Sequence, residues 1–288
     1  MRITPCIVFC LFAFFAAPGF STTQHIAKVV IIIDDLGNND ALSMQAVHLP
    51  APVICSILPQ TPFAYEIDKA AVANHKEIIL HVPMQPIHWQ PLGPGGLTIN
   101  MSQTAFLNTL EQDLNSVPDA FAISNHMGSL MTQNQKNMNW LMIFLQQHHL
   151  AMMDSVTIHN SVAYKTARRE NIPAAYRSVF LDDIVSTSAV TAQFQQLIIA
   201  AKKNGLAIAI GHPNRVTLNY LETAIPQLAK DGIEVIPLSQ AVVPQNLSAQ
   251  TRMQTAALTT IAPQTPAFYQ EPMTLSVKTT LTLSYWLI

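Results

Sequence analysis

The feature that most constrains the fold is an unbroken apolar run, residues 29–33, that ends in two adjacent acids. A short run without polar residues is typical of a strand that is buried on both faces, as in parallel sheets. Asp34 and Asp35 repel each other, so burying both is costly unless a cation, a shared proton or hydrogen bonds compensate. The run therefore predicts a strand that ends in a metal or acid–base site. The alternative is that one acid caps the following turn and the other is solvated.

The composition indicates a globular protein. Of 288 residues, 49% are hydrophobic and only 11% are charged, which is too apolar for a disordered chain. Length alone does not decide how many domains there are, although one α/β barrel would fit. The formal net charge is −2, so no basic surface is expected to attract nucleic acid or anionic lipid.

Residues 1–21 have the pattern of a signal peptide. Arg2 supplies the positive charge, residues 6–17 are apolar, and small residues follow that suit signal peptidase. The apolar run is short for a bilayer and is broken by Pro18, which argues against an uncleaved anchor. We expect a periplasmic or secreted protein with no stable membrane span after cleavage. Its mature chain would keep one cysteine, Cys55, which cannot form an internal disulfide.

From residue 28 onward, short apolar runs alternate with longer amphipathic stretches. Strands are predicted at residues 28–35, 53–59, 77–84, 120–127, 150–156, 178–183, 206–213 and 233–238. Helices are predicted between them, for example at residues 39–49, 62–75, 102–116, 136–149 and 189–204. This repeated βα pattern, without a glycine-rich phosphate loop, favours an α/β fold, a closed or distorted (β/α) barrel of seven or eight parallel strands, over an open sheet.

The barrel is predicted to span residues 28–243. Residues 244–288 are rich in Thr, Gln, Ala and Pro and carry few charges, which predicts a mostly disordered tail. The last eight residues are apolar enough for a short strand or a docking peptide, and the sequence does not decide between these.

Polar residues gather at the ends of the predicted strands. Parallel strands bring their carboxyl ends to one face, where α/β barrels have their active sites. The residues at these ends are Asp34, Asp35, His81, Asn125, His126, Asp154, Asp182, Asp183 and His212. Imidazole with carboxylate is a common ligand set for Zn²⁺. Any one of the histidines could instead be a core residue bonded to a backbone carbonyl, but three of them together favour a site.

Five motifs, IIIDDLG, LHVPMQP, SNHMGS, VFLDD and AIGHP, occur in an order and spacing that resemble the divergent polysaccharide deacetylases. These are a branch of the carbohydrate esterases that share the NodB-like fold, and the resemblance covers about residues 28–243. It implies a distorted (β/α) barrel, a divalent metal and hydrolysis of N- or O-acetyl groups on a polysaccharide. Asp34 matches the superfamily's general base, Asp35 its metal-binding acid and His212 its general acid.

The second motif departs from the superfamily pattern. Ordinary members have two histidines one helical turn apart, whereas here His81 is followed by VPMQ. We expect His126 to supply the missing ligand, because it ends a neighbouring strand and precedes Gly128, which would let the backbone approach a ligand closely. His88, in the following loop, is a weaker substitute. Otherwise the metal site is degraded.

The resemblance then implies a mechanism. A metal, most simply Zn²⁺, held by Asp35, His81 and His126 would acidify a water and polarise the acetyl carbonyl. Residues that could orient a ligand histidine, or set the tautomer of the general acid, are Asn125, Asp154, Asp182 and Asp183. Capping the next helix is the structural alternative for these acids. Trp89, on a loop rich in Pro and Gly, could stack on a sugar ring or simply pack.

Three functions remain open. The first is a metal-dependent deacetylase acting on an envelope polysaccharide. The second is a carbohydrate-binding or structural module that has lost turnover, as the altered second motif suggests. The third is a phosphoacceptor that binds Mg²⁺ through Asp34 and Asp35. It is disfavoured by the signal peptide, by the length of the chain and by strand-end histidines that an oxygen-preferring Mg²⁺ does not need.

Overall fold

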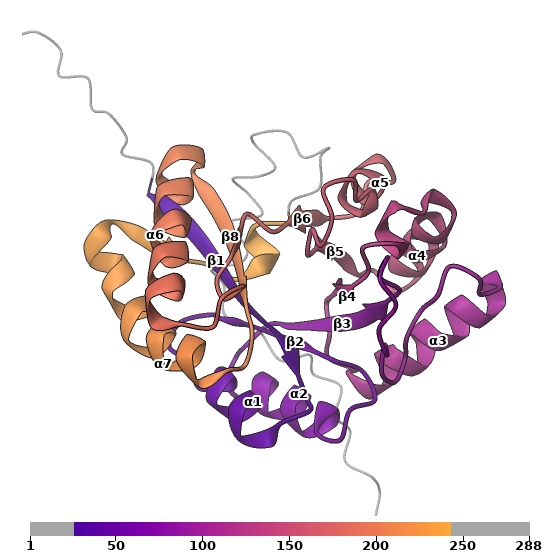
Figure 1. Ribbon diagram of the computed structural model, residues 1–288, viewed down its shortest axis with the longest axis horizontal. Coiled ribbons are helices and arrows are strands. Elements are labelled where there is room, and N and C mark those ends of the chain that lie inside the picture. Colours follow the sequence, from indigo (N-terminus) through magenta and orange to yellow (C-terminus); the bar gives the residue numbers. More distant parts are fainter. Residues whose placement is uncertain (1–25, 243–288) are drawn as a thin grey trace, which may run out of the picture. The chain divides into compact units, whose positions relative to one another are not determined.

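The computed structural model describes residues 26–242 (Figure 1). The predicted signal peptide and the predicted tail lie outside the described residues. Strands are β1 (Ala27–Leu36), β2 (Ile54–Ile57), β3 (Ile78–Met84), β4 (Ala122–Met127), β5 (Ala151–Asp154), β6 (Ala174–Tyr176), β7 (Val179–Phe180), β8 (Leu206–Gly211) and β9 (Ile233–Val235). Helices are α1 (Asp40–Val47), α2 (Ala64–Ala73), α3 (Gln103–Ser116), α4 (Gln135–Gln147), α5 (Ala163–Arg169), α6 (Thr187–Asn204) and α7 (Arg215–Ala224). Three short 3₁₀ turns are η1 (Met131–Gln133), η2 (Ile225–Asp231) and η3 (Leu238–Gln240).

The strands form one parallel sheet that curls into a distorted (β/α) barrel, as predicted. Its order is β6-β5-β4-β3-β2-β1-β8-β7, and β9 pairs with β1. The chain passes from one end of the sheet to the other within two residues, because Arg177 donates its N–H to Asp154 in β5 and Ser178 donates to Ile208 in β8. Figure 1 shows the helices around the outside of this curled sheet.

The apolar run of β1 is buried on both faces. Val29, Ile31 and Ile33 belong to the core between the sheet and the helices. Val30 and Ile32 belong to a second core on the inner face of the sheet. Because strand side chains alternate between the two faces, the same count assigns a strand-end residue to the inner or the outer face wherever the strand geometry is regular.

The structure has one strand more than the eight predicted segments. The additional strand, β6, is three residues long and reads AAY, which carries little of the β-branched signal that marks a strand. The segment predicted at residues 178–183 is a strand only at Val179–Phe180, so the two acids that follow lie in a loop. Within residues 26–242, none of the helices is long and apolar enough to cross a membrane.

Candidate functional site

Four of the predicted site residues share the inner face of the barrel. Asp34 lies two residues after Ile32 on β1, and His126 lies four residues after Ala122 on β4, so each points to the same face as that residue. Ile32 and Ala122 both belong to the inner core. His81 and His212 follow Ile79 and Ile210 in the same way. Period-two alternation therefore delivers these side chains to one end of the barrel interior.

Asp35 reaches the site only because the backbone leaves regular strand geometry. Regular alternation would place its side chain on the same face as Ile31 and Ile33, which face the helices. However, Asp35 has φ of 61°, and the pairing of β1 with β2 shifts register between Ile33 and Leu36. A left-handed residue at such an irregularity redirects the side chain, at a cost of order 1–3 kcal/mol. Both acids can therefore face the same site.

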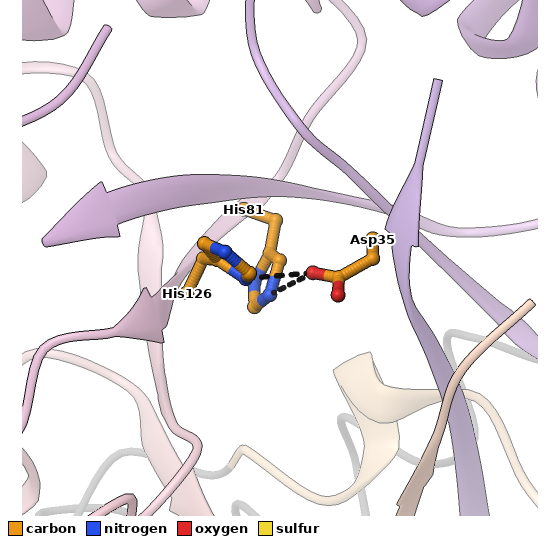
Figure 2. Close-up of side chains that lie close together, drawn as sticks. All are labelled: Asp35, His81 and His126. Carbon is orange, nitrogen blue, oxygen red and sulfur yellow. Dashed lines mark ion pairs between the residues drawn. The ribbon is translucent and has the colours of Figure 1, made fainter. Parts of the chain in front are cut away.

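Asp35, His81 and His126 form a compact group, here called the triad (Figure 2). Asp35 Oδ1 lies 3.2 Å from His81 Nε2 and 2.7 Å from His126 Nδ1. One ligand atom from each residue lies within 4.8 Å of the other two. Burial opposes ionisation of Asp35, but the close contacts with His126 and His81 outweigh it and hold the pKa of its carboxyl well below the usual value.

The triad has the donor set of a catalytic zinc site. Two imidazoles and one carboxylate are protein ligands that leave a fourth tetrahedral position open. Bond lengths of about 2.0–2.2 Å put tetrahedral ligand atoms roughly 3.3–3.5 Å apart. This is close to the 3.2 Å between Asp35 Oδ1 and His81 Nε2. The residues present therefore fit the metal that the sequence implies.

Asp34 lies beside the triad with one oxygen atom unused. It is 2% exposed, and its Oδ2 lies 3.5 Å from His81 Nε2. Its Oδ1 is buried and has no hydrogen-bond partner in the protein. A buried carboxylate oxygen without a partner is costly, which favours a cation or a water as its partner in the working site.

A chain of buried hydroxyls supports His81 from behind. Ser124 Oγ lies 2.6 Å from His81 Nδ1 and 3.3 Å from Ser56 Oγ. An imidazole proton on Nδ1 would be donated to Ser124, which leaves Nε2 unprotonated for a metal. Our sequence reasoning missed Ser124, although it lies two residues before His126 and so had to share its face of β4.

His212 lies beside Asp35 of the triad and is held by Asp182. Its Nδ1 donates to Asp182 Oδ1 at 2.9 Å, and its Nε2 lies 3.9 Å from Asp35 Oδ2. Burial disfavours the imidazolium, but the Asp182 carboxylate outweighs burial and raises the pKa of His212 to about 9. His212 therefore carries a proton at neutral pH. Asp182 Oδ2 also accepts from His212 N, Asn214 Nδ2 and Thr217 Oγ1.

The other three supporting candidates have different places. Asp154 lies on the outer alternation of β5 and accepts hydrogen bonds from Val156 N, Ser161 Oγ and Tyr164 N. It therefore takes the structural alternative, bracing the loop and the start of α5. Asn125 braces the loop after β4, with Nδ2 donating to Met127 O and Oδ1 accepting from Ser155 N. Asp183 is exposed on the wall of the cleft.

The site opens into a cleft of about 880 Å³. Arg177, which our sequence reasoning also missed, lies on its wall and donates to the carbonyls of Ser155 and Val156 at 2.7 Å. Its guanidinium lies 5.0 Å from the centre of the Phe180 ring, which in turn lies 5.1 Å from the His212 ring. Val156 has φ of 48°, a strained conformation for a β-branched residue.

Three loop residues that the sequence singles out, His88, Gly128 and Trp89, lie outside the triad. His88 is exposed and is not part of the triad, so His126 is the histidine that joins His81. Gly128 has φ of 87°, and a Cβ there would lie 3.0 Å from Met84 Cβ. These observations assign it a tight turn and close packing on β3, while the expected close approach to a ligand stays a prediction. Trp89 is 79% exposed, which excludes a packing role within residues 26–242.

The sequence profile of divergent polysaccharide deacetylases matches residues 31–242. The chain belongs to this family. Among curated relatives, the uncharacterized protein YibQ of Escherichia coli (strain K12) is 35% identical over 219 residues, which are 76% of this chain and 69% of YibQ. Membership of the divergent polysaccharide deacetylases confirms the resemblance inferred from the five motifs.

Solved structures share the barrel of this family member. The uncharacterized protein ATU2773 from Agrobacterium tumefaciens C58 aligns with a TM-score of 0.73 at 20% identity, over 75% of this chain and 89% of that chain. A mutant of BA3943, described as a CE4 family pseudoenzyme with restored enzymatic activity, aligns with a TM-score of 0.51 at 12% identity. That alignment covers 76% of this chain and 69% of that chain. These likenesses concern the fold.

Proposed function

We propose that the protein is a metal-dependent hydrolase that removes acetyl groups from an envelope or extracellular polysaccharide. One observation carries the proposal: a triad of two histidines and one carboxylate has a buried acid, Asp34, and a histidine held by a carboxylate, His212, beside it. A divalent ion held by the triad, zinc by its ligand chemistry, would acidify a water and polarise the acetyl carbonyl.

The residues around the triad supply the proton transfers. Asp34 would accept the proton of the attacking water, since its Oδ1 is buried beside the triad without another partner. His212 would donate the proton on Nε2 to the departing amine or alcohol. Asp182 accepts a hydrogen bond from Nδ1, which holds the ring and stabilises the imidazolium that carries the second proton on Nε2, the nitrogen nearer the triad.

A second candidate function is a carbohydrate-binding or structural module that has lost turnover. The absence of the second histidine from the LHVPMQP motif favours it. The BA3943 protein, described as a pseudoenzyme, shows that this barrel is also found without activity. In that case the triad would hold a metal or a ligand without completing hydrolysis.

Two substitutions one residue apart test the roles in the zinc-loaded protein. Asp34→Asn should keep zinc while acetate release from acetylated glycans falls by roughly 10²-fold or more, the usual effect of a positioned base. Asp35→Asn should lose zinc, because it removes the charged ligand. Equilibrium dialysis with metal analysis measures zinc binding, and an acetate assay measures hydrolysis. Tight zinc binding by the unmodified protein without acetate release from any glycan tested would favour the binding module.

We also propose export to the periplasm or the medium, on the charge and apolar pattern of residues 1–21. An envelope polysaccharide would be met there. Mass spectrometry should find a mature N-terminus close to Ser21 in the exported fraction. An intact Met1 on a cytosolic protein would remove both the compartment and the substrate that depends on it.

A further inference from the structure

A second cavity, of about 290 Å³, borders the triad and is here called the side pocket. His126 lines both this cavity and the larger cleft. Asn38, which also lines it, follows Asp35 by three residues at the end of β1. The rest of its wall comes from residues 58–61, from Pro83 and from residues 91–94. The side pocket therefore lies next to the triad.

The wall of the side pocket is apolar and has few hydrogen-bond donors. Its apolar members are Leu58, Pro59, Pro83, Pro91, Leu92 and Pro94. The four prolines among them have no backbone N–H to donate. The hydroxyl of Thr61 donates to Leu58 O, so its proton is already used. No Asp, Glu, Lys or Arg of residues 26–242 lines the cavity. A hydroxyl or a charged group would therefore lose its water there without a full replacement, whereas an alkyl chain would not.

The side pocket is much larger than an acetyl methyl group. In liquid water one molecule takes up roughly 30 Å³, and a methyl group is about as large. A methyl group would therefore fill about a tenth of the 290 Å³ cavity. Each further methylene group that is buried in an apolar site strengthens binding by about fourfold. The volume therefore favours an alkyl chain over a single methyl group.

The loop that forms the outer wall is held in place by the protein. Leu97 donates its N–H to Pro83 O at 2.8 Å, and Gln85 N donates to Leu97 O at 3.0 Å. Gly96 packs so closely against Leu92 that a Cβ at position 96 would lie 2.6 Å from Leu92 Cβ. The wall is therefore formed before a ligand arrives, which reduces the entropy cost of binding.

We infer that the side pocket holds the alkyl chain of the acyl group that is removed, so that the substrate carries an N- or O-acyl group longer than acetyl. This rests on the proposed function for the hydrolysis itself. Water adds to the acyl carbon and gives a proton to Asp34. The bond from that carbon to nitrogen or oxygen breaks, and His212 protonates the departing amine or alcohol. The acyl chain leaves as a carboxylate whose alkyl part lies in the side pocket.

The first measurement is hydrolysis of p-nitrophenyl acetate, butyrate and hexanoate by the zinc-loaded protein. From acetate to butyrate, kcat/KM should rise by about tenfold or more, because two further methylene groups are buried. Leu92→Trp puts a bulky ring into the side pocket and should abolish the preference for the longer esters. Leu92→Ala, which removes apolar contacts without adding bulk, is the second variant and should reduce the preference.

The second measurement needs no turnover. Acetate, butyrate and hexanoate, the carboxylates that such hydrolysis releases, are titrated into the zinc-loaded protein by calorimetry. Affinity should rise with chain length in the unmodified protein and stay flat in Leu92→Trp. Ile87→Trp is the matched control, because Ile87 lies on the same loop, is 48% exposed and lines neither cavity. This control should keep the chain-length dependence of the unmodified protein.

The two measurements separate this inference from the proposed function. Hydrolysis and affinity that do not change with chain length would keep the hydrolase and overturn the role of the side pocket. A chain-length dependence that persists in both Leu92→Trp and Leu92→Ala would overturn that role as well. Length-dependent binding that Leu92→Trp abolishes, without hydrolysis of any ester, would support the side pocket and remove the hydrolase.

Discussion

Asp34 on β1 and Asp182 after β7 are both almost completely buried at the same end of the barrel, but their oxygen atoms are used differently. Asp182 accepts four hydrogen bonds, two from His212 and one each from Asn214 and Thr217. Asp34 has one oxygen without a partner and another 3.5 Å from His81. Asp182, whose two oxygens both accept hydrogen bonds, is here called the saturated carboxylate, and it holds a proton donor in place. Asp34, here called the unsaturated carboxylate, can still accept a partner from outside the chain.

Three of the non-glycine residues with positive φ lie at the site. Asp35, Met127 and Val156 all have positive φ, and they belong to the triad or line the cleft. Such conformations persist only where the surrounding packing enforces them. Here the packing comes from β1, which is buried on both faces, and from β3 and β4 beside it. The rigid sheet therefore stabilises a site that is unfavourable by itself.

The largest effect on stability should come from breaking the saturated carboxylate. Asp182→Ala leaves His212 without its counter-charge and Thr217 without an acceptor, so the metal-free protein should lose about 3–5 kcal/mol of unfolding free energy. Urea denaturation measures this loss, and Asp182→Asn should cost less because it keeps the shape. A loss below about 1 kcal/mol would contradict the importance of these four hydrogen bonds.

A third buried acid, Asp113, tests the comparison of Asp34 with Asp182 through the pH dependence of stability. Asp113 on α3 accepts a hydrogen bond from Gln60 through Oδ1, while Oδ2 is buried without a partner. Burial raises the pKa of Asp113 to about 7, although the Gln60 bond opposes the rise. The folded protein therefore holds this proton more tightly than the unfolded chain does.

The sign of the pH effect follows from that difference. The stability contributed by Asp113 is complete below about pH 4 and is lost as the pH rises through about 7. Asp113→Asn should remove this loss of stability. The unfolding free energy of the variant, relative to that of the unmodified protein, should therefore grow by about 2–3 kcal/mol between about pH 4 and about pH 7. Denaturation at several pH values measures the difference. An advantage that is constant with pH would mean that Asp113 is ionised in the folded protein throughout.

A smaller and opposite effect is expected at the unsaturated carboxylate. In the metal-free protein, Asp34→Asn removes a buried charge that has an unpartnered oxygen, so stability should stay within about 1 kcal/mol or rise. Chelator-treated protein in urea provides the measurement, with Asp182→Asn as the matched change. A loss as large as that of Asp182→Ala would mean that Asp34 is as well satisfied as Asp182, and the contrast would fail.

Much of the site could be predicted by alternation along the strands. Once β1 and β4 are placed, period two assigns Asp34 and His126 to the inner face and Asp154 to the outer face of β5. We did not apply this count to Asp154, and so its bracing role remained only one of two alternatives. Ser124 could have been found in the same way.

Other features depend on contacts that the local sequence does not record. The positive φ of Asp35 accompanies the irregular pairing of β1 with β2, which is a tertiary contact. Strand β6 is too short for a periodic pattern, and it is defined by its pairing with β5, which is a tertiary contact.

The smallest effect on stability is expected for Trp89, which lies outside both carboxylate environments. Its side chain is 79% exposed, so Trp89→Ala should change the unfolding free energy by no more than about 0.5 kcal/mol. An exposed indole on the loop after β3 nevertheless has a flat apolar face on which a sugar ring can stack. We therefore expect glycan affinity to fall by roughly three- to tenfold, as for loss of one aromatic contact. Calorimetry with chitin oligosaccharides measures the change, with Ile87→Ala, at a 48% exposed position of the same loop, as the control. Unchanged affinity in Trp89→Ala would assign sugar recognition to the cleft alone.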